Sequence, residues 1–137
     1  RYVQEWHGAP KDEESRRGFD QFLRDTPINS IKFAYRDAFN RLLAVGICDV
    51  CPRSLSSVYF YFDPSHQQRG LGTYGALFEI DYARRMGLAA YYLGYWVDGC
   101  PSMQYKSTFR PSQALGTDGV WRTTNAVPAC DARAVLP

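Results

Sequence analysis

The residues that could do chemistry begin with a glycine-bearing turn in the middle of the chain. Gln67, Gly70 and Gly72 follow one another at Q-x-x-G-x-G spacing. The β-branched and aromatic run 58–62 before them predicts a strand buried on both faces. The pattern after them predicts a helix beginning near Thr73. A helix start exposes its first backbone N–H groups, so we expect the turn to attract an anion or a polarised carbonyl.

Four cysteines and two histidines are the other residues that commonly carry chemistry, and they indicate no metal site. Cys48 and Cys51 have the spacing of a redox or metal pair, but they lie in and just after an apolar strand-like run. A tetrahedral site would need two further ligands, and His7 and His66 do not cluster with the cysteines in sequence. We expect buried thiols, because a free cysteine behaves as a small hydrophobic residue.

Length and composition predict one domain with one core. The chain has 137 residues, 45% of them hydrophobic and 15% aromatic, and a formal net charge of +2. A net charge this close to zero does not indicate a nucleic-acid-binding protein. There is no apolar run of the roughly 20 residues that a membrane span needs, and no visible signal peptide. We expect a soluble, cytoplasmic protein, and the abrupt start at Arg1 indicates a fragment.

The first half of the chain predicts a short helix and three strands. Phe19, Phe22 and Leu23 have helical spacing within 18–24. Strand-like runs follow at 28–36, 42–50 and 55–62, and their short connections favour antiparallel pairing.

The second half predicts a helix that crosses to a parallel strand. The helix from near Thr73 ends at Met86–Gly87, with Tyr74, Leu77, Ile80 and Ala83 as its expected buried face and ion pairs from Asp81 to Arg84 and Arg85. A buried strand over 90–97, a short helix over 102–109 and a hairpin at Asp118–Gly119 are expected next. The residues from Asn125 onward show little periodicity, and we expect them to cover an edge or fray.

Antiparallel strands, a glycine turn, a helix, a parallel strand and another helix follow the order of the GNAT acyltransferase fold. We therefore predict an α/β (α+β) domain whose mixed, mostly antiparallel sheet is flanked by helices, over residues 1–137.

Several segments taken together resemble one family, the C-terminal domain of the aminoacyl-tRNA protein transferases. These segments are Asp49–Val50, Pro52, Ser56–Tyr59, Tyr61, Asp63–Pro64, Leu71–Thr73, Tyr92–Trp96, Gly99–Cys100, Met103, Tyr105–Lys106 and Phe109–Pro111. The family includes the eukaryotic arginyl-tRNA protein transferases and the bacterial aspartate/glutamate leucyltransferases. The compact segment 83–96 and the tail 116–122 resemble the bacterial members, which ranks leucyl transfer above arginyl transfer.

The chain departs from this family in three places. Cys51 stands where the family usually has leucine, and the connector 37–41 lacks the Asp-Gly turn often found there. The family's cysteine-rich N-terminal region, associated with metal or iron–sulfur binding, would precede Arg1. We expect no cofactor in this chain, with aminoacyl-tRNA as the co-substrate.

The resemblance implies attack by a protein's N-terminal amine on the ester that joins an amino acid to tRNA. Because the acceptor begins with Asp or Glu, its carboxylate calls for Lys106, Arg110 or Arg69. Lys106 and Arg110 are four residues apart, so one helical face could present both. Spacing alone favours a solvated basic face, and an exposed loop arginine explains Arg69 equally well.

Proton handling and substrate orientation complete the candidate site. Asp49, Tyr59, Tyr61 and Tyr105 are candidates to accept or relay a proton, although a turn carboxylate and core tyrosines explain them as well. Ser56 or Ser57 could orient the carbonyl oxygen. Tyr95, with Tyr92 and Trp96, could stack on the aminoacyl or adenine group, and the RNA end is expected at Gly70, Gly72 and Thr73.

Two other functions remain open on the sequence. An N-acetyltransferase would bind acetyl-CoA directly, with the glycine turn holding its pyrophosphate. A non-catalytic module for acidic N-termini or RNA would bind without turnover.

Overall fold

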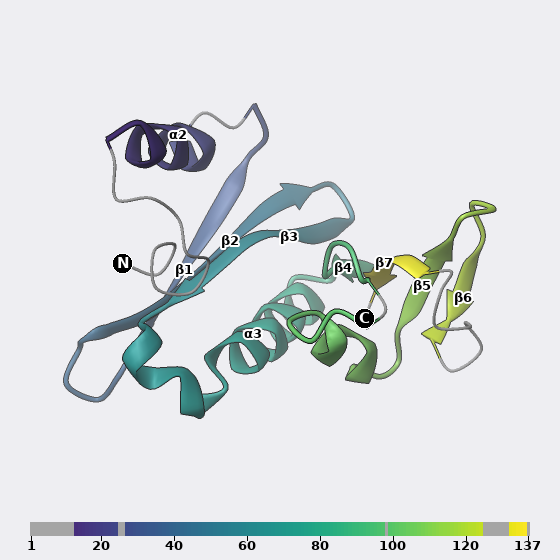
Figure 1. The fold of residues 1–137 in the computed structure, drawn as a ribbon. Helices are drawn as coiled ribbons and strands as arrows, with labels where there is room; N and C mark the ends of the chain where they lie inside the picture. The colour runs from purple at the N-terminus through teal and green to yellow at the C-terminus, as the bar shows by residue number, and fades with distance from the viewer. Residues whose placement is uncertain (1–12, 25–26, 98, 125–131, 137) are drawn as a thin grey trace.

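The β-branched and aromatic runs form one antiparallel meander in the computed structural model, which describes residues 13–24, 27–97, 99–124 and 132–136 (Figure 1). β1 (Ser30–Arg36), β2 (Leu42–Cys51) and β3 (Ser54–Phe62) pair in chain order. β4 (Ala90–Tyr92) joins β3 in parallel, which gives a mixed sheet in the order β1-β2-β3-β4. The predicted strands and the parallel crossover are confirmed.

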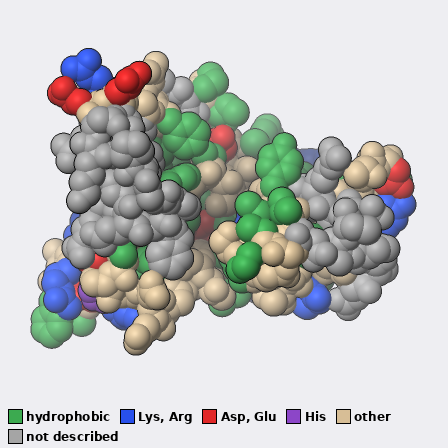
Figure 2. Space-filling view, viewed as in Figure 1, with side chains coloured by type: hydrophobic (Ala, Val, Ile, Leu, Met, Phe, Trp, Pro, Cys, Tyr) green, Lys and Arg blue, Asp and Glu red, His purple; other side chains and the backbone are tan. Residues whose placement is uncertain are grey.

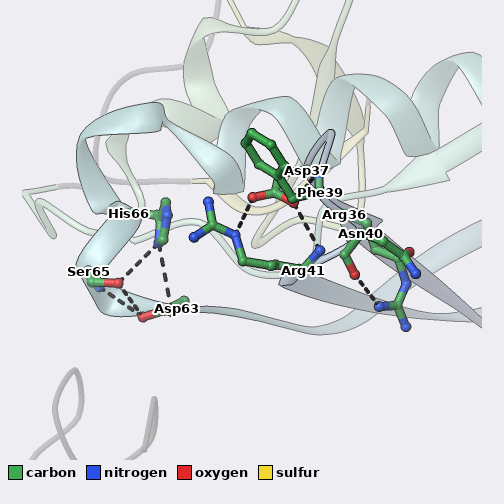
Figure 3. Close-up of polar contacts among 8 residues, drawn as sticks. All are labelled: Arg36, Asp37, Phe39, Asn40, Arg41, Asp63, Ser65 and His66. Atoms are coloured by element: carbon green, nitrogen blue, oxygen red, sulfur yellow. Dashed lines mark hydrogen bonds and ion pairs between the residues drawn. The ribbon is translucent and has the colours of Figure 1, made fainter.

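The connector between β1 and β2 turns without the Asp-Gly pair because another residue supplies the left-handed backbone. Asn40 has a φ of 63°. The Asp37 carboxylate accepts hydrogen bonds from the backbone N–H groups of Phe39 and Arg41, each at 2.9 Å. Figure 3 shows these contacts together with the 2.7 Å bond from Arg41 Nε to Asp37.

A 3₁₀ helix and an α-helix lie between β3 and β4. The 3₁₀ helix η1 (Pro64–Arg69) follows the predicted stop at Asp63–Pro64, and α3 (Leu71–Arg85) begins directly after Gly70. α3 ends before Gly87, which has a φ of 69°. The predicted ion pairs from Asp81 to Arg84 and Arg85 are confirmed, each at 3.0 Å.

The buried face of α3 differs in part from the predicted one. Ala83 is buried and Ile80 packs against the core as expected, but Tyr74 and Leu77 are 56% and 53% exposed. The buried residues of the helix are Leu71, Gly75, Ala76, Glu79 and Ala83. The sheet explains the difference, because the aromatic side chains that it turns toward α3 leave no room for a side chain at Gly75. A Cβ at Gly75 would lie 2.2 Å from the Phe60 ring.

The opposite face of the sheet carries α2 (Glu13–Arg24), as Figure 1 shows. The predicted helix over 18–24 is confirmed, with an earlier start. The rings of Phe22 and Tyr59 are 6.1 Å apart, edge to face. The run 58–62 is therefore not fully buried as predicted, since every one of its residues keeps some solvent exposure.

A second, three-stranded sheet follows β4. η2 (Gln104–Thr108) is a 3₁₀ helix, and β5 (Gln113–Gly116) then pairs with β6 (Trp121–Thr123) across the predicted turn at Gly119, which has a φ of 77°. β7 (Ala132–Leu136) pairs with the other edge of β5. One hydrophobic core joins the two sheets, with Cys48, Leu55 and Tyr91 packed against Phe109 and Ala114.

In Figure 2 most visible charged groups lie at α2, at the β1–β2 loop and at the β5–β6 hairpin, while hydrophobic groups gather over the middle. None of the described helices is both long and apolar enough to cross a bilayer.

Gly75→Ala should lower the free energy of unfolding by about 1–3 kcal/mol, because its methyl group would overlap the Phe60 ring. Gly72→Ala is the matched control on the same helix, since a Cβ there meets no atom within 4 Å. It should leave stability unchanged or raise it by up to about 1 kcal/mol. Urea unfolding of both variants measures the difference. Equal stabilities would contradict the proposed packing.

Candidate functional site

The strands β3 and β4 pair over only three residues and then separate. The register joins Ser54 to Ala90, Leu55 to Tyr91 and Ser56 to Tyr92. The predicted strand over 90–97 is therefore too long, since residues 93–97 leave the ladder and Gly94 has a φ of 78°. We call the place where β3 and the chain after Tyr92 part, from Ser57 and Leu93 onward, the seam.

A β-bulge in β3 stands at the start of the seam. Cys48 of β2 lies opposite Ser57, and the next residue, Ile47, lies opposite Tyr59, so Val58 is the extra residue. Ser57 shares the face of Cys48, whose thiol contacts Glu79 of α3. Tyr59 faces α2 instead. The bulge thus aims two nearby polar side chains to opposite faces of the sheet, a common arrangement beside active sites.

The start of α3 presents the amide groups that the glycine turn predicts. Gly70 is left-handed, with a φ of 61°, and Tyr74 N–H makes the first helical hydrogen bond to its carbonyl at 3.0 Å. The N–H groups of Leu71, Gly72 and Thr73 precede that bond, so they form the open helix start. A Cβ at Gly72 would meet no atom within 4 Å, so the space on the side-chain side of this residue is open.

The 3₁₀ helix before this turn is fixed by local polar contacts (Figure 3). Asp63 caps η1 by accepting from the N–H of Ser65 at 3.1 Å and from its hydroxyl at 2.7 Å. His66 Nδ1 lies 3.0 Å from the same hydroxyl, which accounts for this histidine without a ligand. Arg69 is exposed at the end of η1.

A cavity of about 640 Å³ lies along α3 and connects its first turn with the segment after η2. Thr73, Leu77 and Arg84 line it from α3, and Tyr91, Phe109 and Arg110 line the other side. Arg110 and the helix start therefore border the same space. The cavity combines apolar walls with two guanidinium groups, so it suits a ligand with an aromatic or aliphatic part and an anionic part.

Lys106 and Arg110 do not share one helical face, so this prediction is wrong. η2 ends at Thr108, and Phe109 is extended, so Arg110 lies beyond the helix. Arg110 Nη1 donates to the carbonyls of Ser107 and Phe109 at 2.5 and 2.7 Å. Lys106 Nζ donates instead to the carbonyl of Tyr95 at 2.8 Å. The two cations thus lie in different surroundings.

The Lys106 ammonium lies beside the chain that leaves the sheet after β4. Burial lowers its pKa from the ordinary 10.5, and a nearby Cys100 acts weakly in the other direction. One hydrogen bond to Tyr95 leaves an ammonium with two further donors. The Tyr95 side chain is 72% exposed, so a ligand could stack on it.

The proposed proton-handling residues divide between the two faces. Tyr59 and Tyr61 lie toward α2 with ring centroids 6.2 Å apart, and burial raises the pKa of both hydroxyls. Asp49 lies on the same face, because it is two residues along β2 from Ile47, which pairs with Tyr59. The Asp49 carboxylate accepts a hydrogen bond from Ser30 Oγ at 2.9 Å.

Tyr105 belongs with η2, away from that pair. Burial raises the pKa of its hydroxyl, and the negative charge of Glu79 raises it further. Its ring packs edge to face against Phe109 at 6.1 Å.

Glu79 is the polar residue that sequence analysis missed. Its side chain is 1% exposed. Tyr35 donates to Oε1 at 3.0 Å, while Cys48 and Tyr91 donate to Oε2 at 3.2 and 2.5 Å. Gly46 makes room, since a Cβ there would lie 2.0 Å from Oε1. One sequence pattern could have indicated that Glu79 is buried. Gly75, Ala76 and Ala83 form a stripe of small residues on the same side of the helix as Glu79.

The expectation of buried thiols is confirmed for Cys48, which is fully buried. Cys51 is only partly buried. Across the described ranges, no three His, Cys, Asp or Glu side chains are grouped to hold a metal ion. The groups suited to a ligand are the helix start and the cavity beside it.

Solved structures with this arrangement are acetyltransferases. The ribosomal-protein-S18-alanine N-acetyltransferase from Escherichia coli has a TM-score of 0.57 at 19% identity, over 98% of this chain and 81% of its own. A GCN5-related N-acetyltransferase from Kribbella flavida has a TM-score of 0.60 at 14% identity, over 94% and 79%. The GNAT fold is confirmed.

Curated relatives show closer sequence similarity. The aspartate/glutamate leucyltransferase of Stutzerimonas stutzeri is 44% identical over 102 residues, covering 74% of this chain and 43% of the relative. That of Pseudomonas syringae pv. tomato is 39% identical over 125 residues, covering 90% and 52%. The chain spans about half the length of these relatives. Residues 1–116 match the family described as arginine-tRNA-protein transferase, C terminus, and the chain belongs to that family.

Proposed function

We propose that this chain is the catalytic part of an enzyme that transfers leucine from aminoacyl-tRNA to the N-terminal amine of proteins beginning with Asp or Glu. The observation that carries the proposal is the 39–44% identity to aspartate/glutamate leucyltransferases. In the cytoplasm this addition would mark its targets for degradation. Arginine is the alternative amino acid. The chain itself needs no cofactor, because aminoacyl-tRNA is a co-substrate that already carries an activated ester.

The reaction requires positioning more than activation. The neutral amine attacks the ester carbonyl, a C–N bond forms, and the bond from the carbonyl carbon to the ribose oxygen breaks. The nitrogen loses one proton and the ribose oxygen gains one. Holding the amine in a fixed orientation against the ester carbonyl lowers the barrier, because the entropy of bringing the two together is lost on binding.

The RNA end is placed in the cavity beside α3 in this proposal. Thr73, in the first turn of α3, and Arg110 both line that cavity, and Gly72 is the neighbour of Thr73 in the same turn. A helix start and an arginine both favour phosphate. Arg69, exposed at the same turn, would extend the contact along the RNA backbone.

The acceptor protein approaches through the seam, and Lys106 pairs with its acidic side chain. Lys106 donates to the carbonyl of the exposed Tyr95, on the chain that leaves the sheet after β4, and neither residue is among those that line the cavity assigned to the RNA end. This divides the roles of Lys106 and Arg110, which the sequence had assigned together to the acceptor carboxylate.

Different residues handle the two proton transfers, one from the attacking amine and one to the departing ribose oxygen. Because the pKa values of Tyr59 and Tyr61 are raised, their hydroxyls stay protonated and orient the amine. Asp49, on the same face, is the proposed proton acceptor. The raised pKa of Tyr105 keeps a proton available for the departing ribose oxygen.

Transfer itself is tested by the mass of the product. The full-length protein, incubated with a mixture of charged tRNAs, acetyl-CoA and a peptide beginning with Asp, should add leucine to the peptide. Leucine, arginine and acetyl groups differ in mass, so one mass spectrum of the peptide product distinguishes the three activities. Acetylation, or binding of the peptide without any product, would contradict the proposal.

Lys106→Ala should reduce the preference for acidic N-termini. The ratio of kcat/KM for peptides beginning with Asp and Asn should fall by an amount equivalent to about 1.5–3 kcal/mol, the value of a hydrogen bond to a charged group. Lys32→Ala, which removes an exposed charge from β1, should leave the ratio unchanged.

The same preference should depend on pH. The Lys106 ammonium is charged below its pKa, so the preference is present at neutral pH and disappears as pH rises. Because burial lowers that pKa, the loss should occur below the ordinary 10.5. An unchanged ratio in Lys106→Ala would remove this residue from acceptor recognition.

Arg110→Ala should weaken tRNA binding for acidic and neutral acceptors alike. Loss of one phosphate contact should reduce the slope of log KM for aminoacyl-tRNA against log salt by about 0.7. Arg85→Ala is the matched control, since Arg85 pairs with Asp81 and does not line the cavity. A selective effect on acidic acceptors would instead return Arg110 to the acceptor site.

A further inference from the structure

The loop between β1 and β2 holds an aromatic side chain in solvent on a fixed backbone. Phe39 is 81% exposed at the tip of this loop. The Asp37 side chain, which is only 8% exposed, accepts hydrogen bonds from the N–H groups of Phe39 and Arg41 and from Arg41 Nε (Figure 3). A single exposed phenylalanine needs no explanation. A ring on a fixed loop, however, has already lost conformational entropy that binding a ligand would otherwise cost.

Arg41 covers one face of this ring. Its guanidinium carbon lies 5.6 Å from the centre of the Phe39 ring, within the range of a cation–π contact. The same guanidinium group bonds to Asp37 through Nε at 2.7 Å, so turning away from the ring would break that ion pair. Because most of Phe39 is exposed, its other face is open to a flat group that could stack on it.

Further cations lie around the loop. Arg36 Nη1 donates to the carbonyl of Asn40 at 2.9 Å, which holds a second guanidinium group at the loop. The N–H of Asp63 donates to the carbonyl of Leu43 at 2.8 Å, so the start of η1 lies beside the end of the loop. Arg69 is exposed at the other end of η1, just before the glycine turn. Figure 2 shows Lys and Arg side chains beside the purple histidine at this end of the molecule.

The charges at this end are arranged for an anion. We call four exposed side chains the loop surface: Arg36, Phe39, Arg41 and Arg69. Two nearby carboxylates serve the backbone instead, since Asp37 holds the loop and Asp63 caps η1. Outward guanidinium groups favour a ligand with several negative charges, and an open ring favours one with flat groups. Nucleic acid has both, in its phosphates and its bases.

The loop surface adjoins the site assigned to the RNA end. Leu71, the first residue of α3, belongs to one hydrophobic cluster with Leu43, the second residue of β2. The start of α3 and the loop therefore occupy the same end of the sheet (Figure 1). The cavity beside α3 includes Thr73 of this first turn. A strand that ends in the cavity would leave it past Arg69, toward the loop.

We propose that the loop surface binds the nucleotides of aminoacyl-tRNA that precede the esterified one: Phe39 stacks on a base, and the three arginines contact phosphates. The inference rests on the proposed function and extends its RNA site beyond the terminal nucleotide. Asp37 is a positioning residue, because it holds both Arg41 and the backbone of Phe39. Contacts so far from the ester bind the ground state and the transition state alike, so they lower KM for the tRNA without changing kcat.

The test measures transfer of leucine from leucyl-tRNA to an Asp peptide by the full-length protein. Phe39→Ala should raise KM for leucyl-tRNA roughly five- to a hundredfold with kcat unchanged, as for one lost base–aromatic stack. Uncharged tRNA, as a competitive inhibitor, should lose affinity by the same factor. Phe39→Tyr keeps the ring and should keep the wild-type KM. Val120→Ala is the matched control, since Val120 is an exposed apolar residue of the β5–β6 hairpin, at the other end of Figure 1.

Two further variants separate positioned contacts from general attraction between charges. Asp37→Ala removes a negative charge, which by charge alone should strengthen RNA binding. Because it also frees the ring and Arg41, we expect KM for leucyl-tRNA to rise instead, with KM for the peptide unchanged. Arg36→Ala should reduce the slope of log KM for tRNA against log salt by about 0.7. Arg17→Ala, which removes an exposed charge from α2, should leave this slope unchanged.

Three results would overturn the inference in distinguishable ways. Leucine transfer with the wild-type KM for leucyl-tRNA in Phe39→Ala overturns the loop surface and leaves the proposed function intact. A higher KM for the acceptor in Phe39→Ala, without a change for tRNA, assigns the surface to the acceptor and also overturns the inference. If arginine is transferred, arginyl-tRNA takes the place of leucyl-tRNA in each measurement. Absence of any aminoacyl transfer by the wild-type protein overturns both proposals.

Discussion

The buried carboxylate of Glu79 is the constraint on which the arrangement depends. One side chain of α3 accepts hydrogen bonds from β1, β2 and β4, so the helix is fixed against three strands at one point. Gly46 in the sheet and Gly75 on the helix allow the close approach, because a side chain at either position would overlap Glu79 or Phe60. The position of α3 then fixes its first turn, and with it the open N–H groups that follow Gly70.

The seam follows from the same geometry. β4 is held to β3 at Leu55 and Tyr91, where the core is tightest, and beyond Tyr92 the chain turns away with Gly94 at a positive φ. The bulge at Val58 places Ser57 on one face of the sheet and Tyr59 on the other. Polar side chains at the start of the seam therefore face both sides of the sheet.

Sequence patterns predicted the elements well where one residue type dominates. The strands β1, β2 and β3, the glycine turn, the ends of α3 and the Asp118–Gly119 hairpin have strong local signals, and each is confirmed. The predicted buried face of α3 was wrong at Tyr74 and Leu77, because periodicity alone ranks them above Gly75 and Glu79. Only the aromatic face of the sheet decides that small residues must turn inward. Arg110 was misplaced because four-residue spacing was read as α-helix, whereas η2 is a 3₁₀ helix that ends at Thr108.

Stability alone gives a poor account of Glu79. Buried ionic groups are often replaced by apolar residues of similar size without loss of stability, because desolvation offsets their hydrogen bonds. Removing a single donor, by contrast, costs about 1–3 kcal/mol, since the carboxylate stays buried. The Glu79 network therefore loses stability when any one donor is removed, yet it adds little stability beyond what a leucine or methionine at this position would give. What an apolar residue cannot supply is hydrogen bonds to donors on three strands at once, which fix the position of α3 against β1, β2 and β4.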